Sequence, residues 1–256
     1  RSNPTGAAFP PMALKSTIYR AELAVADIDR GYYRDHLLTL ARHPSETDER
    51  MMVRLLAFAL HADDGLTFGR GISTEDEPDL WRRDLTGIVE QWIDVGLPDE
   101  TVVRKACGRA NEVFVYAYGG RAVGLWWDKA REKFERQDRL AVSEVPLEAS
   151  RALAGLAARS MRLQCTIQDG HVFLSDGATS VPVELGGKRF DQIAAELFPD
   201  YSRARLQQWI KSGELTADKV SRQVKDKLMA GAQLALHAQL QPVDEWQAED
   251  IELDIV

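Results

Sequence analysis

Acidic side chains with one lysine nearby are the residues of this sequence best suited to chemistry. Asp79 directly follows a proline, and Asp94 lies 15 residues later in a segment rich in β-branched and aromatic residues. Carboxylate oxygens are the ligands that Mg²⁺ prefers, and a lysine beside such an ion can orient an attacking water. The candidate catalytic residues are Glu49, Asp79, Glu90, Asp94 and Lys105, and the candidate metal ligands are Asp79 and Asp94.

One strand and two helices must position these residues. Alternation over residues 88–95 predicts a strand with Glu90 and Asp94 on the same face. A helix is predicted over residues 46–62, with Ser45 as its N-cap, and a second helix carries the lysine directly after the strand. Because carboxylates on a buried face need a cation or a basic partner, the same acids could instead form ion pairs with neighbouring arginines.

Other kinds of site are disfavoured by composition and spacing. The five histidines are scattered without the spacing of a zinc site, and neither cysteine has a CxxC neighbour. No glycine-rich phosphate loop occurs, so we expect no organic cofactor and at most Mg²⁺ or Mn²⁺. The absence of a long apolar run argues against a membrane span, and the two cysteines suit a reducing, cytoplasmic location.

The remaining pattern predicts an α/β fold. Residues 16–42 alternate around a turn and predict a hairpin, and a second hairpin turns at Asp169 and Gly170. The segment "AVGLWWDKAREKF" is predicted to begin as a strand and continue as a helix, and a further helix is predicted over 146–160. Residues 1–11 are expected to be a disordered leader or a remnant of cloning.

Several long motifs of the first 176 residues resemble the YaeQ family, among them "LTLARHPSETDERMMVRLLAFAL", "QWIDVGLPDE" and "LQCTIQDGHVFLSD". The resemblance implies a compact mixed-sheet, restriction-endonuclease-like core with an added β-hairpin, built on a variation of the PD-(D/E)XK nuclease motif. By this resemblance Glu49 corresponds to the acid on the first core helix, and Asp79 and Asp94 correspond to the metal-binding acids. Glu90 could take either metal-binding role instead. Gly96 stands where the motif has lysine, so Lys105 would act from the neighbouring helix.

The charge pattern changes near the C-terminus. Residues 186–231 carry nine basic and six acidic residues, a net charge of +3, whereas residues 232–256 carry a net charge of −6. A helix is predicted over 202–212, capped by Ser202 and ended by Gly213. We place a domain boundary between Ser180 and Gly187, with one domain over 12–180 and the second over 186–256.

The second domain resembles the S-four RNA-binding domain, also called the alpha-L motif, most closely the version in RluD-type pseudouridine synthases. The segment "GGKRFDQIAAELFPDYSRARLQQWIKSGELTADKV" carries the resemblance. The RNA-binding positions that it implies are Arg189, Ser202, Arg203, Arg205, Gln208, Lys211 and Lys219. The usual glycine before Lys219 is missing, and no segment resembling the catalytic motif of a pseudouridine synthase is present.

Two functions of different classes follow. The first is a Mg²⁺-dependent nuclease, or a relic of one, bound to structured RNA by its C-terminal module. The second is a non-catalytic binding or scaffold protein in which the nuclease-like fold has no activity. The basic helix could also be an ordinary solvated surface, and salt-dependent RNA affinity distinguishes these possibilities.

Overall fold

The computed structural model describes residues 16–69, 77–134, 136–186, 190–217, 221–224 and 234–238. A five-stranded sheet in the order β10-β9-β8-β1-β2 forms one layer. Its strands are β1 (Thr17–Asp27), β2 (Tyr32–Arg42), β8 (Ser160–Gln168), β9 (His171–Ser175) and β10 (Ser180–Val183). Neighbours are antiparallel except β1 and β8, so both predicted hairpins are present.

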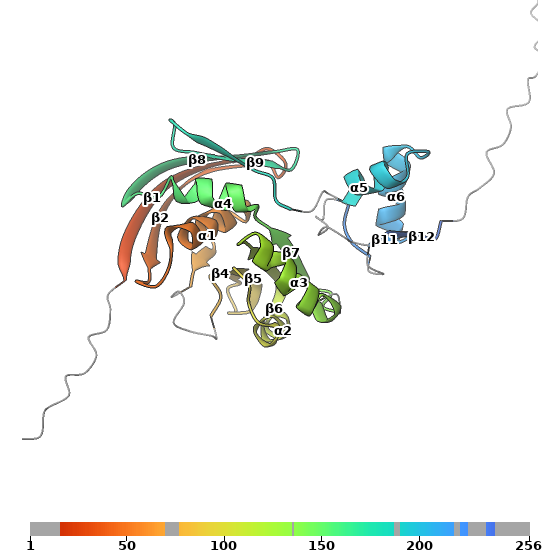
Figure 1. The fold of residues 1–256 in the computed structure, drawn as a ribbon, viewed down its shortest axis with the longest axis horizontal. Helices are drawn as coiled ribbons and strands as arrows, with labels where there is room; N and C mark the ends of the chain where they lie inside the picture. Colours follow the sequence, from red (N-terminus) through yellow and green to blue (C-terminus); the bar gives the residue numbers. More distant parts are fainter. Residues whose placement is uncertain are drawn as a thin grey trace, which may run out of the picture.

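Two helices cover the inner face of this sheet, namely α1 (Asp48–Leu60) and α4 (Leu147–Ala154). In Figure 1 strands β1, β2, β8 and β9 arch over both helices. Burial alternates along β1, and its inward side chains join those of α1 and α4 in one hydrophobic cluster. The period of two in the sequence therefore marked the correct face.

A second five-stranded sheet lies on the other side of α1, in the order β3-β4-β5-β6-β7. The first three strands are antiparallel, and β5, β6 and β7 are parallel. One face of this sheet contributes to the hydrophobic cluster that contains α1, called here the α1 cluster. The other face packs against α2 and α3 in a second hydrophobic cluster. The elements are β3 (Leu66–Phe68), β4 (Leu80–Arg83), β5 (Val89–Val95), α2 (Glu100–Arg109), β6 (Ala110–Ala117), α3 (Arg121–Phe134) and β7 (Leu140–Glu144).

Some predicted element boundaries were wrong. Ser45 does not cap α1, because its hydroxyl group pairs with His43 Nδ1 at 2.6 Å, and Thr47 accepts the Arg50 N–H instead. The segment expected to begin as a strand is helical throughout α3, since its aromatic residues pack at helical spacing against one cluster. Helix α4 ends at Ala154 rather than at residue 160. Strands β4, β7 and β10 were not anticipated.

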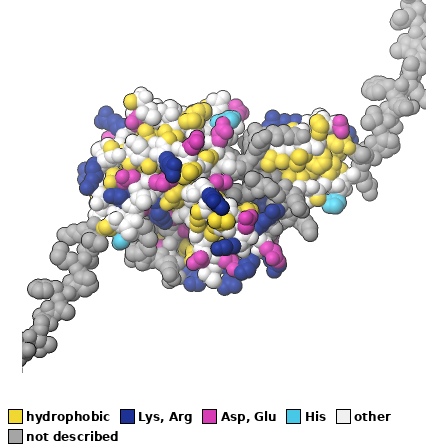
Figure 2. All heavy atoms as spheres, in the orientation of Figure 1, with side chains coloured by type: hydrophobic (Ala, Val, Ile, Leu, Met, Phe, Trp, Pro, Cys, Tyr) yellow, Lys and Arg dark blue, Asp and Glu magenta, His cyan; other side chains and the backbone are white. Residues whose placement is uncertain are grey.

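A smaller unit is built from α5 (Phe190–Leu197), α6 (Arg203–Ser212), β11 (Leu215–Ala217) and β12 (Leu234–Leu236). The two strands pair antiparallel, and the unit has a hydrophobic cluster of its own. The predicted caps of α6 are present, with Gly213 in the left-handed region at φ 77°. Figure 2 shows that hydrophobic side chains also gather on the visible face of this unit.

The larger unit continues into the interval in which we placed the domain boundary. Strand β10 extends the first sheet to Val183, and Leu185 belongs to the α1 cluster. Gly186 forms an isolated bridge with Glu144. The overall class is mixed α/β, as predicted. No helix within the described ranges is long and apolar enough to cross a membrane.

A carboxylate–arginine cluster and a basic helix as candidate sites

Asp79 and Asp94 lie side by side, where β4 begins and β5 nears its end. Both side chains are buried. Asp79 Oδ2 accepts the backbone N–H of Val95 at 2.8 Å, and the backbone of Asp79 is hydrogen-bonded to the Asp94 carboxyl group. The antiparallel pairing of β4 with β5 therefore brings together the two acids that the sequence proposed as metal ligands.

Two arginines of α1 hold Asp79. Arg50 Nη2 donates to both carboxylate oxygens at 2.8 Å, and Arg54 Nε lies 3.5 Å from Oδ1. Both guanidinium groups also donate to Glu46, whose side chain is fully buried. Arg50 and Arg54 share one face of α1 because they are four residues apart, so the helix presents both guanidinium groups to Asp79. Glu46 lies two residues before the helix begins and pairs with both arginines from there.

Asp94 has a different environment from Asp79. The Trp92 indole N–H donates to its Oδ2 at 2.9 Å. Burial and the nearby charge of Asp79 raise the pKa of Asp94 to about 6, although the Trp92 hydrogen bond and the Arg50 charge oppose the shift. A carboxyl group with such a pKa can exchange a proton near neutral pH.

The other three candidate catalytic residues have other surroundings. Glu49 accepts a hydrogen bond from the buried Ser150 hydroxyl group of α4 at 2.6 Å. Glu90 is the extra residue of a β-bulge and pairs with Arg82 at 2.8 Å. Lys105 is exposed on α2, and within the described residues it has no hydrogen bond or ion pair with these acids. Asp79 and Asp94 are thus brought together, but the lysine is not joined to them.

Sequence reasoning missed the basic half of the cluster. Arg50 and Arg54, which both pair with Glu46, form the centre of the cluster. Tyr118 follows β6 and lies near this centre, with a hydrogen bond to the Thr47 side chain. Burial raises the pKa of Tyr118, and the Glu49 charge adds to this shift, whereas the Arg50 charge opposes it. The spacing of Arg50 and Arg54 by four residues was visible in the sequence and predicts that they share one side of a helix. Their acidic partner Asp79 is distant in sequence, so the ion pairs could not be predicted.

The donor set does not fit a Mg²⁺ or Mn²⁺ ion as it is arranged. Both oxygens of Asp79 contact the Arg50 guanidinium group, which a metal ion would have to displace. In the part of the chain that the structure describes, no three His, Cys, Asp or Glu side chains converge as metal ligands. The arrangement favours the ion-pair interpretation, and metal binding stays a prediction.

The second candidate site is the exposed side of α6. Ser202 caps the helix by accepting the Arg205 N–H at 3.3 Å. Leu206, Trp209 and Ile210 are buried in the cluster of the small unit, as predicted, whereas Arg205, Gln208 and Lys211 are exposed. The Arg205 guanidinium group lies 5.4 Å from the centre of the Trp209 ring.

Arg203 is engaged within the unit. Its Nη2 and Nε lie 3.0 and 3.3 Å from Oδ2 of Asp191, and Gln207 Nε2 donates to the same oxygen at 3.0 Å. Asp191 is fully buried near the start of α5, so these contacts fix α6 against α5. Arg189 and Lys219, the remaining predicted RNA-binding residues, lie outside the described residues.

Comparison with known proteins separates the chain into two matched parts. Over 79 residues the chain is 54% identical to ribosomal large subunit pseudouridine synthase D of Pseudomonas aeruginosa, a match that covers 31% of this chain and 25% of the synthase. The matched segment is therefore only a quarter of that protein.

The larger part matches YaeQ proteins. The family model described as YaeQ protein matches residues 12–185. An uncharacterised YaeQ protein of Salmonella typhi is 48% identical over 175 residues, 68% of this chain and 96% of the relative. The crystal structure of a YaeQ protein from Xanthomonas axonopodis pv. citri is 55% identical, with a TM-score of 0.65 over 66% of this chain and 96% of that chain. The chain belongs to the YaeQ family.

Proposed function

We propose that this protein binds structured RNA through the unit formed by α5, α6, β11 and β12. The observation that carries the proposal is the 54% identity with a segment of a ribosomal large subunit pseudouridine synthase. That enzyme's name describes action on the large ribosomal subunit, so we propose folded large-subunit ribosomal RNA as the substrate class. The exposed residues of α6 provide the chemistry.

The contacts divide the basic residues of α6 by role. Arg205, Gln208 and Lys211 follow one another at a spacing of three residues and are exposed, so they can reach phosphates along one ridge. Arg205 can also stack on a base, because its guanidinium group is planar and already lies over Trp209. Arg203 contributes mainly by holding α6 to Asp191. We assign direct contact to Arg205 and Lys211, and positioning to Arg203.

RNA affinity measured against salt concentration tests this proposal. Fluorescence anisotropy of a labelled large-subunit ribosomal RNA hairpin should give a dissociation constant that rises steeply between about 50 and 200 mM KCl, since each phosphate contact releases counterions. An unstructured RNA of equal length and composition should bind more weakly. A flat salt dependence, or equal affinity for both RNAs, would contradict RNA binding by this surface.

For the larger unit we propose a scaffold role without catalysis, because Asp79 is fully engaged by arginines. One observation favours the alternative of a metal-dependent nuclease with a PD-(D/E)XK-like core. Asp79 and Asp94 are adjacent, and the pKa of Asp94 is raised to about 6. The cytoplasmic location of the protein stays a prediction.

A thermal-shift experiment separates the two roles of the larger unit. If Asp94 binds a metal ion, millimolar Mg²⁺ or Mn²⁺ raises the Tm of the wild type but not of Asp94→Asn. The scaffold role predicts equal shifts in both proteins. Cleavage of a mixed nucleic-acid panel that requires Mg²⁺ and is lost in Asp94→Asn would establish the nuclease and overturn the scaffold role.

A further inference from the structure

The outer face of the sheet β10-β9-β8-β1-β2 carries large apolar side chains in contact with solvent. Helices α1 and α4 lie on its inner face, and Figure 1 shows no labelled helix on the outer one. Tyr33 is 61% exposed, Leu37 is 86% exposed and Phe173 is 42% exposed. Solvent-facing sheet surfaces are normally polar, so three large apolar side chains exposed on one such face favour an interaction surface.

Strand register arranges these residues around a shallow groove. Tyr33 is paired with Ala26, Ala26 with Thr166, and Thr166 with Phe173, so the two aromatic residues flank a floor of small side chains. Three strand spacings separate Tyr33 from Phe173, a distance of about 14 Å. An α-helix with its side chains is about 10–12 Å wide, so one helix fits between them.

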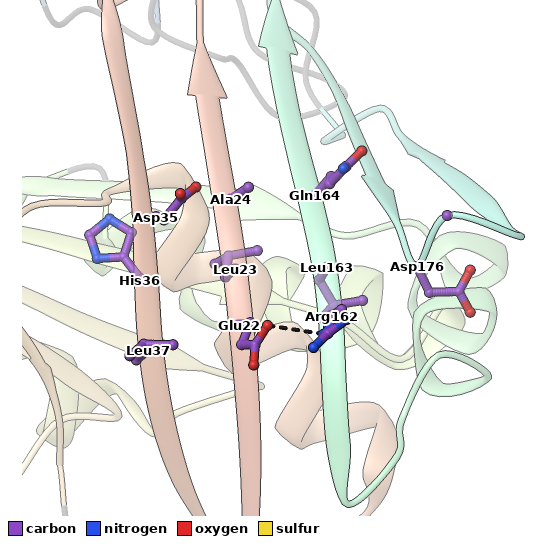
Figure 3. A pocket seen from close by; sticks show the side chains of 11 residues that line it. Glu22, Leu23, Ala24, Asp35, His36, Leu37, Arg162, Leu163, Gln164 and Asp176 are labelled. Atoms are coloured by element: carbon purple, nitrogen blue, oxygen red, sulfur yellow. Dashed lines mark ion pairs between the residues drawn. The ribbon is translucent and has the colours of Figure 1, made fainter.

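Two hollows on this face adjoin each other. Their volumes are about 390 and about 500 Å³, and both are lined by Ala24, Asp35 and Gln164. Figure 3 shows these three residues side by side on neighbouring strands, above the Glu22–Arg162 ion pair. That ion pair, at 3.1 Å, limits the groove at one end.

The charge of the groove favours a basic partner. Its lining includes three acids, Glu22, Asp35 and Asp176, and two arginines. Both arginines have acidic partners, since Arg162 pairs with Glu22 at 3.1 Å and Arg34 lies 3.8 Å from Asp64. Hydrogen bonds from backbone N–H groups lower the pKa of Asp176, which keeps it ionised. Within the described residues the Asp35 carboxylate has no hydrogen bond or ion pair. A phosphate backbone would be repelled here, whereas lysine or arginine would be attracted.

We propose that this groove binds an amphipathic helix of a partner protein, with its apolar side against Ala24, Ala26 and Phe173 and a lysine or arginine opposite Asp35. The floor lies in the middle of the sheet, where no strand edge is free to pair, so a helix fits better than an added strand. This inference is independent of RNA binding by the small unit.

A synthetic peptide provides the first test. An 18-residue leucine–lysine amphipathic helix is titrated into the full chain, with a leucine–glutamate peptide of the same pattern as its control. We expect the lysine peptide to bind with a perturbation of the amide NMR signals of Ala24, Asp35 and Gln164, and the glutamate peptide to bind at least tenfold more weakly. Equal binding of both peptides, or perturbation centred elsewhere, overturns the proposal.

Variants then locate the site and exclude general attraction to an acidic protein. Ala26→Trp fills the groove without a charge change, and Asp35→Lys reverses the charge opposite the peptide. Both should weaken binding at least tenfold, whereas Asp128→Lys, the same charge change on α3, should leave it nearly unchanged. Unaltered binding by Ala26→Trp contradicts the proposal.

Two other occupants give distinct outcomes in the same experiment. If the free chain forms dimers in sedimentation velocity and Ala26→Trp abolishes them, the occupant is a second copy, and the proposed partner helix is wrong. If single-stranded RNA perturbs the same amide signals, the charge argument fails. Circular dichroism melts of each variant confirm that folding is retained.

Discussion

At the scale of single residues, Asp94 combines burial, a hydrogen bond from Trp92 and proximity to Asp79. Its pKa is raised from the ordinary value near 4 to about 6, so between these values the folded chain binds more protons than the unfolded chain. The wild type therefore loses stability as the pH rises from about 4 to about 6, and the loss is complete above that range.

Asp94→Asn should remove this pH dependence. The free energy of unfolding of the variant, relative to the wild type, should increase by on the order of 2–3 kcal/mol between pH 4 and pH 7. Urea unfolding at several pH values measures the difference, with the exposed Asp128→Asn as the matched control. Parallel pH profiles for the wild type and Asp94→Asn would show that burial does not oppose ionisation of Asp94.

Glu46 neutralises two arginines, one of them fully buried. Glu46→Gln removes this charge and leaves Arg54 with Asp79, at 3.5 Å, as its remaining acidic partner among the described residues. We expect a loss of about 3 kcal/mol in the free energy of unfolding, since breaking a buried ion pair leaves an uncompensated charge. Urea unfolding measures it against Glu148→Gln, an exposed glutamate on α4. A loss equal to that of the control would contradict the structural role of the cluster.

At the scale of elements, the contact of α5 with α6 depends on one carboxylate. Asp191 Oδ2 accepts hydrogen bonds from Arg203 and Gln207, and the Asp191 backbone N–H donates to Val224. A change at Arg203 therefore alters the packing of the unit as well as its surface charge.

Arg203→Ala should destabilise the small unit by about 1–3 kcal/mol, because the buried Asp191 carboxylate then loses its ion pair with the Arg203 guanidinium group. Arg205→Ala, which removes the same charge two residues later, should lose less than about 1 kcal/mol, the size of its contact with Trp209. Urea unfolding followed by the NMR signal of the Trp209 indole N–H compares the two. Equal losses would contradict the division between positioning and contact residues.

Elements with a strong period could be predicted from the sequence, and those that depend on packing could not. Alternation marked β1 and β5, and the caps of α6 were visible as Ser202 and Gly213. The α3 segment has apolar residues that suit a strand, and its helical state follows from the hydrophobic cluster that it joins. Thr47 caps α1 because the Ser45 hydroxyl group is hydrogen-bonded to His43, a contact that sequence spacing alone does not show.

At the scale of the whole molecule, the chain combines a YaeQ unit and a smaller unit with its own hydrophobic cluster. Long motifs made both parts recognisable from the sequence. The candidate site was only half predictable, because Asp79 and Asp94 were found but Arg50, 29 residues before Asp79, was not. Whether an acid contacts an arginine or is free to bind a metal ion depends on how α1 packs against β4, which the sequence pattern does not show.

The acidic charge of the whole chain does not oppose RNA binding, because it is unevenly distributed. The chain has a net charge of −8, whereas residues 186–231 have a net charge of +3. Local charge decides affinity within a Debye length of about 8–10 Å at physiological salt. The proposal therefore depends on Arg205 and Lys211, two exposed cations of α6 that can be removed while the Arg203–Asp191 ion pair is kept.

The most direct test is the salt dependence of RNA affinity for the double variant Arg205→Ala with Lys211→Ala. Its matched control is Arg104→Ala with Arg121→Ala, which removes two exposed cations from the larger unit. The slope of log affinity against log salt should become shallower by roughly 1.4–1.8 in the α6 variant, for two lost phosphate contacts, and stay unchanged in the control. Equal slopes in the wild type and the α6 variant would contradict RNA binding through α6.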